Sequence, residues 1–334
     1  MFPARVLVFV ALASPAATAS SGSPAQVARG RYLATAVCEC FECHSPLEKG
    51  ELEIPIAAKL GAGDILNRDQ RRIAPNLTPD RATGAGSWTD EQMTRAIREG
   101  ISHDGRKLSL VMPYDYFSVM TDDDVASIVA YLRSLPAVRN PLPKWIPTDA
   151  AEPPPEPVRR PLTPAEIAQP VERGAYLVRL ARCGVCHTAR PAGKSWRYRR
   201  LDMEFGGGRR FLTAPLHDEL DPDPATAEAP KELSERPGEV VVSANITSDP
   251  SGIAYFDEEI FIKTIRTGRE AGIRPLSAAM PWFEFRKMTD EDLRAIFQYL
   301  RSVPPVRHRV NNFDPPTWCP RCGRLHGLGE LNAP

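Results

Sequence analysis

A cluster of thiols near the N-terminal end raises the question of what chemistry this sequence supports. The stretch CECFECH, from Cys38 to His44, holds three cysteines and one histidine. On a helix, positions i, i+3 and i+4 share one face, so Cys40, Cys43 and His44 should point the same way. Two thiols one turn apart can form thioether bonds to the two vinyl groups of a haem, and the histidine can then bind the iron. The motif therefore predicts covalent attachment of haem c.

The same C-x-x-C-H spacing recurs at Cys183, Cys186 and His187. The surrounding sequence repeats as well, because RGRYLATAVCECFECH is answered by RGAYLVRLARCGVCH, and a block beginning with SLVMPYDYF by one beginning with SAAMPWFEF. A redox-active CxxC pair is one alternative, but it would need a βαβ context that the sequence lacks. Half of a zinc site is another alternative. We expect two covalently bound haem c groups.

Each haem iron needs a second axial ligand if it is to be six-coordinate. Met112 and Met280 occupy matching positions, and each precedes a proline. Because proline disfavours helix at the preceding residue, each methionine should lie in an extended loop that can cross a haem face. Core packing is the alternative for any methionine, and His103 is a second candidate for the first haem. The predicted axial ligands are His44, Met112, His187 and Met280.

Both copies resemble class I c-type cytochrome domains. Each has a Gly/Tyr-bearing helix that leads into CxxCH, then a Met loop, then a last helix with a tyrosine. The resemblance implies that the first and last helices cross where Gly30 meets Tyr131 and where Gly174 meets Tyr299. It also implies that Trp88, Asn76 and Asn245 lie near the haem propionates.

The signatures PNLTPD and TGAGSWTDEQM look like those of di-haem and multi-haem cytochrome subunits of bacterial periplasmic dehydrogenases, although a third CxxCH is lacking. The resemblance implies an electron carrier between a dehydrogenase donor and a cytochrome or oxidase acceptor, with no catalytic residue. His/Met ligation raises the haem potential and leaves neither iron open to substrate. The rival hypothesis is a di-haem enzyme, peroxidase-like or thiosulfate-oxidising, with one open haem. A non-redox zinc or scaffold protein is a third.

The elements expected around the motifs are helices. Thr89 and Gln92 form a capping box, and Gly100 suits the end of that helix. Thr121 and Thr289 each precede a run of apolar residues at helical spacing. No alternating strand pattern stands out. The predicted fold is all-α, with two tandem class I cytochrome c-like haem domains joined by a Pro-rich linker.

The predicted boundaries follow composition. A signal peptide is predicted over 1–19 from Arg5, a short apolar run and an A-x-A site. The apolar run is too short for a membrane anchor. The remaining ranges are an N-terminal domain at 20–150, a linker at 151–169, a C-terminal domain at 170–310 and a tail with a CxxC at 311–334. Export implies the periplasm, and no other segment is long and apolar enough to span a membrane. Equal numbers of basic and acidic residues, 42 of each, give no support for nucleic-acid binding.

Three cysteines remain after haem attachment. Cys319 and Cys322 lie in CPRCG, which lacks the histidine of a haem motif. They resemble one knuckle of a zinc ribbon, but a closed zinc site needs four ligands. Cys38 and His326 could complete it if the tail folds back on the first domain. A disulfide among the three cysteines is the simpler expectation in an oxidising compartment.

Overall fold

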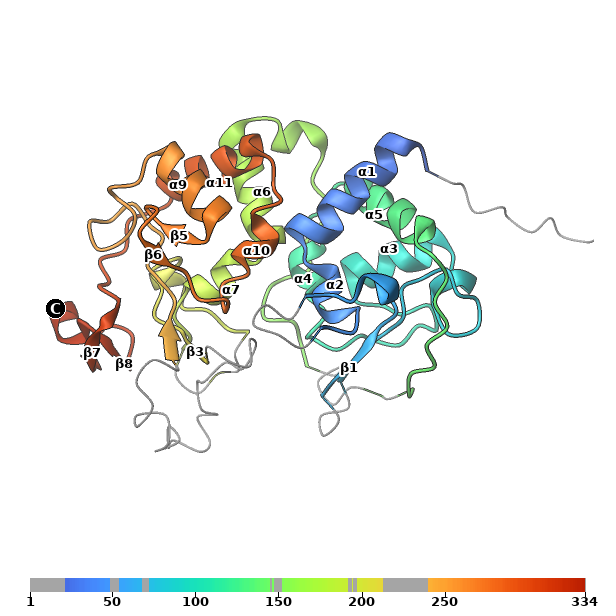
Figure 1. Cartoon of the computed structure of the whole chain (residues 1–334), viewed down its shortest axis with the longest axis horizontal. Helices are drawn as coiled ribbons and strands as arrows, with labels where there is room; N and C mark the ends of the chain where they lie inside the picture. The colour runs from blue at the N-terminus through green and yellow to red at the C-terminus, as the bar shows by residue number, and fades with distance from the viewer. Residues whose placement is uncertain are drawn as a thin grey trace, which may run out of the picture.

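The structure is a computed structural model that describes residues 22–48, 54–67, 72–144, 146, 152–191, 194, 197–212 and 240–333. Two groups of helices lie side by side, each containing one CxxCH motif (Figure 1). We call residues 22–140 the first CxxCH region and residues 164–308 the second CxxCH region; the tail follows. The predicted signal peptide lies outside the described residues, and the other predicted boundaries stay predictions.

Short elements dominate both regions. The first CxxCH region contains α1 (Pro24–Tyr32), a π-helical turn (Leu33–Val37), α2 (Cys40–Cys43), β1 (Asp64–Asn67), β2 (Arg72–Ala74), α3 (Asp90–Glu99), α4 (Tyr114–Phe117) and α5 (Asp122–Ser134). The second contains α6 (Pro170–Leu180), α7 (Cys183–His187), β3 (Arg210–Leu212), β4 (Val240–Val242), α9 (Glu258–Thr267), β5 (Arg269–Glu270), β6 (Arg274–Pro275), α10 (Trp282–Phe285) and α11 (Asp290–Ser302). The tail contains β7 (Asn311–Cys319) and β8 (Arg324–Gly327). Single 3-10 turns cover Ala57–Lys59, Ala85–Ser87, Pro164–Ile167, Leu201–Met203 and Gly329–Asn332.

The prediction of an all-α fold is wrong. Within the described residues, eight strands pair antiparallel into four two-stranded sheets: β1 with β2, β3 with β4, β5 with β6, and β7 with β8. One sheet belongs to the first region, two to the second and one to the tail, so the regions are not two copies of one helical domain. Most of these strands have two to four residues, too few for the period-2 alternation by which a strand is recognised in a sequence.

Glycines set how closely the main helices approach. A Cβ on Gly30 of α1 would lie 1.8 Å from the carbonyl oxygen of Ser127 in α5. A Cβ on Gly174 of α6 would lie 1.9 Å from the carbonyl oxygen of Ala295 in α11. No side chain fits at such distances, so the predicted crossing of first and last helices at these glycines is confirmed. The tyrosine is a nearest neighbour only in the second crossing, where Tyr299 Cβ approaches Gly174.

The expected caps are also present. Thr89 and Gln92 form the predicted capping box of α3, which ends at Gly100 in the left-handed conformation with φ of 68°. The side chains of Thr121 and Thr289 accept hydrogen bonds from backbone amides in the first turns of α5 and α11. These caps satisfy amide groups that a helix leaves unpaired at its start.

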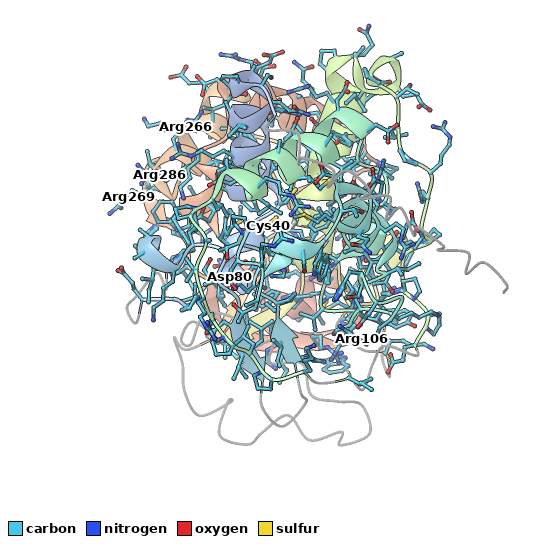
Figure 2. All side chains as sticks on the ribbon, turned by 90° about the vertical axis from the view of Figure 1, so that its right-hand side faces the viewer. Cys40, Asp80, Arg106, Arg266, Arg269 and Arg286 are labelled. Carbon is cyan, nitrogen blue, oxygen red and sulfur yellow. The ribbon has the colours of Figure 1, made fainter. Side chains whose placement is uncertain are left out.

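Proline-rich chain between the two regions packs against the first. The amide of Leu162 donates to the carbonyl of Val119 at 3.0 Å, and the amide of Arg159 donates to Ser118 Oγ at 3.1 Å. Figure 2 shows Arg269 projecting at the edge of the molecule. Across the described ranges, every helix falls short of the length and hydropathy needed to cross a bilayer.

Candidate cofactor site

Each CxxCH helix begins after a residue in the left-handed conformation. Glu39, with φ of 52°, precedes α2, and Arg182, with φ of 58°, precedes α7. This conformation costs an L-residue other than glycine about 1–2 kcal/mol, and here it turns the chain sharply between the preceding helix and the motif. The two residues also meet, because Arg182 Nη2 donates to Glu39 Oε2 at 2.8 Å. The starts of the two motifs are therefore joined by an ion pair.

The histidine of each motif is fixed through one ring nitrogen. His44 Nδ1 lies 2.9 Å from the carbonyl oxygen of Pro75, and His187 Nδ1 lies 2.8 Å from that of Ala244. A carbonyl only accepts, so Nδ1 carries the proton and Nε2 keeps its lone pair. Burial lowers the pKa of both imidazoles, because desolvation disfavours the charged form. In both rings Nε2 is therefore the nitrogen left available to a metal ion.

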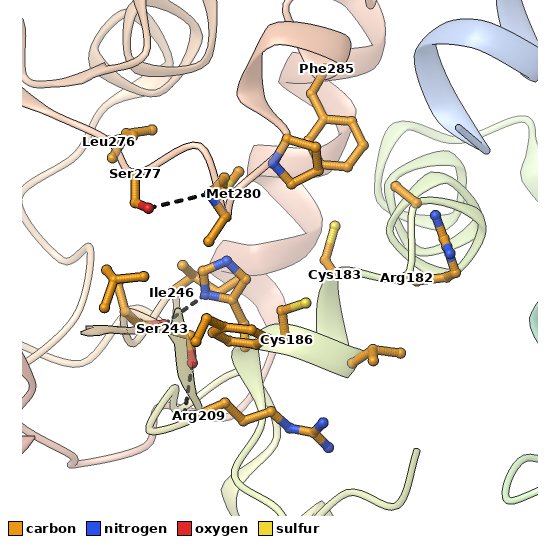
Figure 3. A pocket seen from close by; sticks show the side chains of 18 of the residues that line it. Arg182, Cys183, Cys186, Arg209, Ser243, Ile246, Leu276, Ser277, Met280 and Phe285 are labelled. Carbon is orange, nitrogen blue, oxygen red and sulfur yellow. Dashed lines mark hydrogen bonds between the residues drawn. The ribbon is translucent and has the colours of Figure 1, made fainter. Parts of the chain in front are cut away.

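A cavity of about 1530 Å³ contains the predicted residues of the second site. Cys183, Cys186, His187 and Met280 all line it. Figure 3 shows the thiols of Cys183 and Cys186 on α7, with Met280 in the loop before α10 lying across the pocket from that helix. The structure therefore brings together, from separate elements, the thiols, the imidazole and the thioether that the sequence assigned to one site.

The walls of this cavity suit a haem. Apolar side chains line one part of it, among them Ile246, Phe285 and Leu293. Arginines line another part, including Arg190 and Arg209, both buried. A haem is a flat apolar ring with two carboxylates at one edge, and guanidinium groups bind carboxylates well. The residues present therefore fit a covalently attached haem.

Of the predicted residues of the first site, all of which the structure describes, Cys43 alone lines this cavity. Cys40 and Met112 pack against the main hydrophobic core, as Cys183 and Met280 also do. The two methionine loops have matching backbone geometry: the Met112 amide donates to Ser109 at 3.1 Å and the Met280 amide donates to Ser277 at 3.1 Å. Each methionine lies two residues before a short helix and is separated from it by proline. It lies in a loop, as predicted, but in a turn closed by the bond to serine and not in extended chain.

The two asparagines expected near the propionates have other partners. Asn76 Nδ2 donates to the carbonyl of Val138 at 2.7 Å, and Asn245 Nδ2 donates to that of Val306 at 2.7 Å. The oxygen of each amide accepts from the backbone two residues further on. Both side chains therefore bind the chain that follows the last helix of their region. His103, the alternative ligand, stacks on the Trp88 ring with centroids 4.3 Å apart.

Sequence reasoning missed the contact between the two regions. Asp124 of α5 accepts from Arg29 of its own region at 2.8 Å and from the hydroxyl of Tyr176 in the other region at 2.7 Å. Burial and the carboxylate of Asp124 raise the pKa of Tyr176, so this hydroxyl stays protonated.

A second contact mirrors the first. Asp292 of α11 accepts from Arg173 of its own region at 2.5 Å and from the hydroxyl of Tyr32 at 2.5 Å. The three residue types recur at corresponding places, Arg-Gly-x-Tyr before each CxxCH and an aspartate after each capping threonine. That recurrence was the available indication that these residues act together.

Comparison with known proteins matches residues 27–136 to the cytochrome c family model, described as cytochrome c. The prediction of two tandem cytochrome c domains is therefore wrong by this comparison, which finds one.

The chain is 30% identical over 311 residues to the fructose dehydrogenase cytochrome subunit of Gluconobacter japonicus, covering 86% of this chain and 54% of the relative. It is 30% identical over 313 residues to the cytochrome c subunit of alcohol dehydrogenase (quinone) of Gluconacetobacter polyoxogenes, covering 88% and 59%. It is 26% identical over 323 residues to the gluconate 2-dehydrogenase cytochrome c subunit of Pantoea cypripedii, covering 89% and 64%. The chain thus spans a little over half the length of the first two relatives.

Proposed function

We propose that this protein carries single electrons between a dehydrogenase and a downstream acceptor, because residues 27–136 match the cytochrome c family model. The observation that carries the proposal is the pair of CxxCH motifs, each with a histidine whose Nδ1 is bound to a backbone carbonyl. A cytochrome c domain implies covalently bound haem c, and two such motifs support two of them.

Each motif supplies the attachment residues and one axial ligand. Cys40 and Cys43 would hold the first haem, and Cys183 and Cys186 the second. Four side chains would bind the irons: His44 and Met112 in the first site, His187 and Met280 in the second. For the second site, the cavity that these residues share supports the assignment. For the first, the matching loop geometry of Met112 supports it.

Haem c would supply reversible one-electron chemistry at iron. The protein's own part is to orient and shield. The carbonyls of Pro75 and Ala244 hold the two imidazole planes in place, as partners beyond the ligand do in metal sites generally. Apolar walls would exclude water, and a buried arginine such as Arg190 would offset the charge of the propionates. A rigid, dry site keeps reorganisation small when the charge changes.

The names of the relatives support the proposed donor. Each of the three is a cytochrome subunit of a dehydrogenase, for fructose, alcohol or gluconate. We therefore propose that the donor is a dehydrogenase subunit, that the acceptor is a cytochrome or oxidase, and that the N-terminal 19 residues direct export to the periplasm.

The experiment is to express the chain with a haem c maturation system and determine its mass and haem content. Wild type should carry two haems per chain, Cys183→Ser/Cys186→Ser one, and Cys40→Ser/Cys43→Ser one. The control is Cys38→Ser, a buried thiol outside both pairs, which should keep two. A wild-type mass equal to the bare polypeptide would overturn the proposal.

Carbon monoxide distinguishes the carrier from a di-haem enzyme. If methionines fill both sixth positions, the reduced protein should bind carbon monoxide slowly or not at all at neutral pH. Replacing Met280 by alanine should open one site, and replacing Met288, buried at the end of the same segment, should not. Prompt binding by the wild type would favour the enzyme.

A further inference from the structure

Four metal-binding side chains converge in the tail, away from both CxxCH motifs. They are His308, Cys319, Cys322 and His326, and their ligand atoms all lie within 4.8 Å of one another. All four are buried, with exposed fractions of 0%, 0%, 6% and 1%. We propose that these residues bind one zinc ion in a closed tetrahedral Cys₂His₂ site that fastens the tail to the second CxxCH region.

Two of the distances between ligand atoms match a tetrahedral ion. With Zn–N of about 2.0–2.1 Å and Zn–S of about 2.3 Å, tetrahedral geometry separates two nitrogens by about 3.3 Å and nitrogen from sulfur by about 3.5 Å. His308 Nε2 lies 3.2 Å from His326 Nε2 and 3.5 Å from Cys319 Sγ. A mixed thiolate and imidazole set of this shape is typical of zinc.

The orientation of the two imidazoles also calls for a cation. His308 Nδ1 lies 2.7 Å from the carbonyl oxygen of Gly206, and His326 Nδ1 lies 3.0 Å from that of Gly327. Both protons are therefore on Nδ1, and two Nε2 lone pairs face each other at 3.2 Å. Two neutral acceptors at that distance repel unless a proton or a metal ion lies between them.

The thiols come from a turn of the kind that binds zinc. Cys319 ends β7, Cys322 follows in the turn to β8, and the amide of Gly323 donates to the Cys319 carbonyl at 2.8 Å. No disulfide joins these thiols or any of the seven cysteines, all of which lie in the described ranges. The fourth ligand differs from the sequence hypothesis, because His308 takes the place considered for Cys38.

The tail needs such a fastening. An isolated two-stranded hairpin is marginally stable in water, and this one exposes its large apolar residues, with Phe313 at 74% and Trp318 at 60%. Its small buried cluster consists of the two cysteines with Ala189, Met203 and Val306. Hydrophobic burial is therefore slight, and small units of this kind gain stability from a structural metal.

Neighbouring glycines leave room for the cluster. Gly208 has φ of +98°, and a Cβ there would lie 2.8 Å from His308 Cε1 and 3.7 Å from Cys322 Sγ. The triplet GGG at 206–208 therefore lets the chain after α7 pass directly against the proposed site. Since the amide of Gly207 donates to the His187 carbonyl at 2.8 Å, the same segment also contacts the second CxxCH motif.

The test is metal analysis of the haem-loaded full chain, purified without chelators. We expect about one zinc per chain, and zinc X-ray absorption should show two sulfurs at about 2.3 Å and two nitrogens at about 2.0–2.1 Å. Cys319→Ser/Cys322→Ser should lose the zinc while haem iron is retained. The matched control is Cys38→Ser, a buried thiol outside the cluster, which should keep it.

Two results would overturn the proposal. One is a wild-type protein without zinc whose intact mass and peptide map show a Cys319–Cys322 disulfide. The other is zinc that persists in the double variant, which would place it elsewhere. If the double variant does not accumulate, the zinc X-ray absorption spectrum of the wild type decides by itself. Haem content is measured separately, so failure here leaves the proposed electron transfer untouched.

Discussion

The two CxxCH regions hold their motifs by the same contacts and differ in what those motifs touch. In both regions the motif histidine binds a backbone carbonyl through Nδ1. In both, an asparagine later in the region binds the chain that follows the last helix. The residues at corresponding positions differ, however. Glu39 precedes the first motif and Arg182 the second, and Asn140 of the first region corresponds to His308 of the second. The shared contacts shape a cofactor site, whereas the differing residues make the asymmetric contacts, between the regions and with the tail.

Breaking the Glu39–Arg182 pair should have the largest effect. Arg182→Gln leaves a carboxylate with 4% side-chain exposure uncompensated, and removing one partner of a buried pair costs about 3–5 kcal/mol of unfolding free energy. Chemical unfolding of the haem-loaded protein, followed by circular dichroism, measures this. Glu39→Gln/Arg182→Gln should recover much of the loss.

The control for that prediction is a surface pair. Arg160 and Glu166 form an ion pair with 67% and 36% side-chain exposure, so Arg160→Gln should cost less than about 1 kcal/mol. If both arginine variants lose the same small amount, the contact between the motifs contributes nothing and the two regions are held together elsewhere.

The helix crossings test whether the regions are equivalent where they look alike. Gly30→Ala and Gly174→Ala should each cost about 1–3 kcal/mol or more, because the new Cβ meets a backbone oxygen that cannot move alone. Thermal unfolding of the two variants should give similar losses. Gly105→Ala, whose Cβ meets nothing within 4 Å but whose φ is +82°, measures the cost of backbone strain without a packing clash. A large difference between the two crossings would refute their equivalence.

Some of this organisation could be predicted from sequence because it is encoded locally. The CxxCH spacing, the caps at Thr89, Thr121 and Thr289, and the close approach at Gly30 each depend on residues within a few positions or on a side chain that must be absent. The small sheets could not be predicted, because strands of two to four residues depend on partners brought close by the rest of the fold.

Contacts between distant segments were also beyond the sequence argument. Tyr32 and Asp292 are 260 positions apart, and although the recurrence of both residue types indicates a shared role, it does not say that the tyrosine of one region binds the aspartate of the other. The tail shows the same limit: the CxxC suggested zinc, but His308 precedes it by 11 positions and has no motif of its own. Its place in the cluster follows from the hydrogen bond to Gly206, which only the structure shows.

Removing the hydroxyl of Tyr32 or of Tyr176 should lower stability by similar amounts, smaller than the loss from breaking the Glu39–Arg182 pair. Tyr32→Phe and Tyr176→Phe each remove a hydrogen bond to a carboxylate between the regions, worth about 1.5–3 kcal/mol. Unfolding by urea measures both. Tyr255→Phe, whose hydroxyl binds Glu270 on an exposed side chain, should change stability much less. A loss in one variant only would show that the interface is held from one side.

The smallest effect on stability is expected when Asn140 of the first region is replaced by histidine, the residue at the corresponding position, 308, of the second region. Asn140 Nδ2 donates to the carbonyl of Ala62 at 2.9 Å, as His308 Nδ1 donates to that of Gly206 at 2.7 Å. Asn140→His can keep this bond, so it should cost at most about 1.5 kcal/mol, the value of one hydrogen bond. It should gain no zinc, because the thiols come from the tail. His308→Asn should also keep its bond yet lose the metal, and metal analysis of the two variants separates these roles. If both variants held the same amount of zinc, His308 would be an ordinary loop residue, equivalent to Asn140 in role as well as in place.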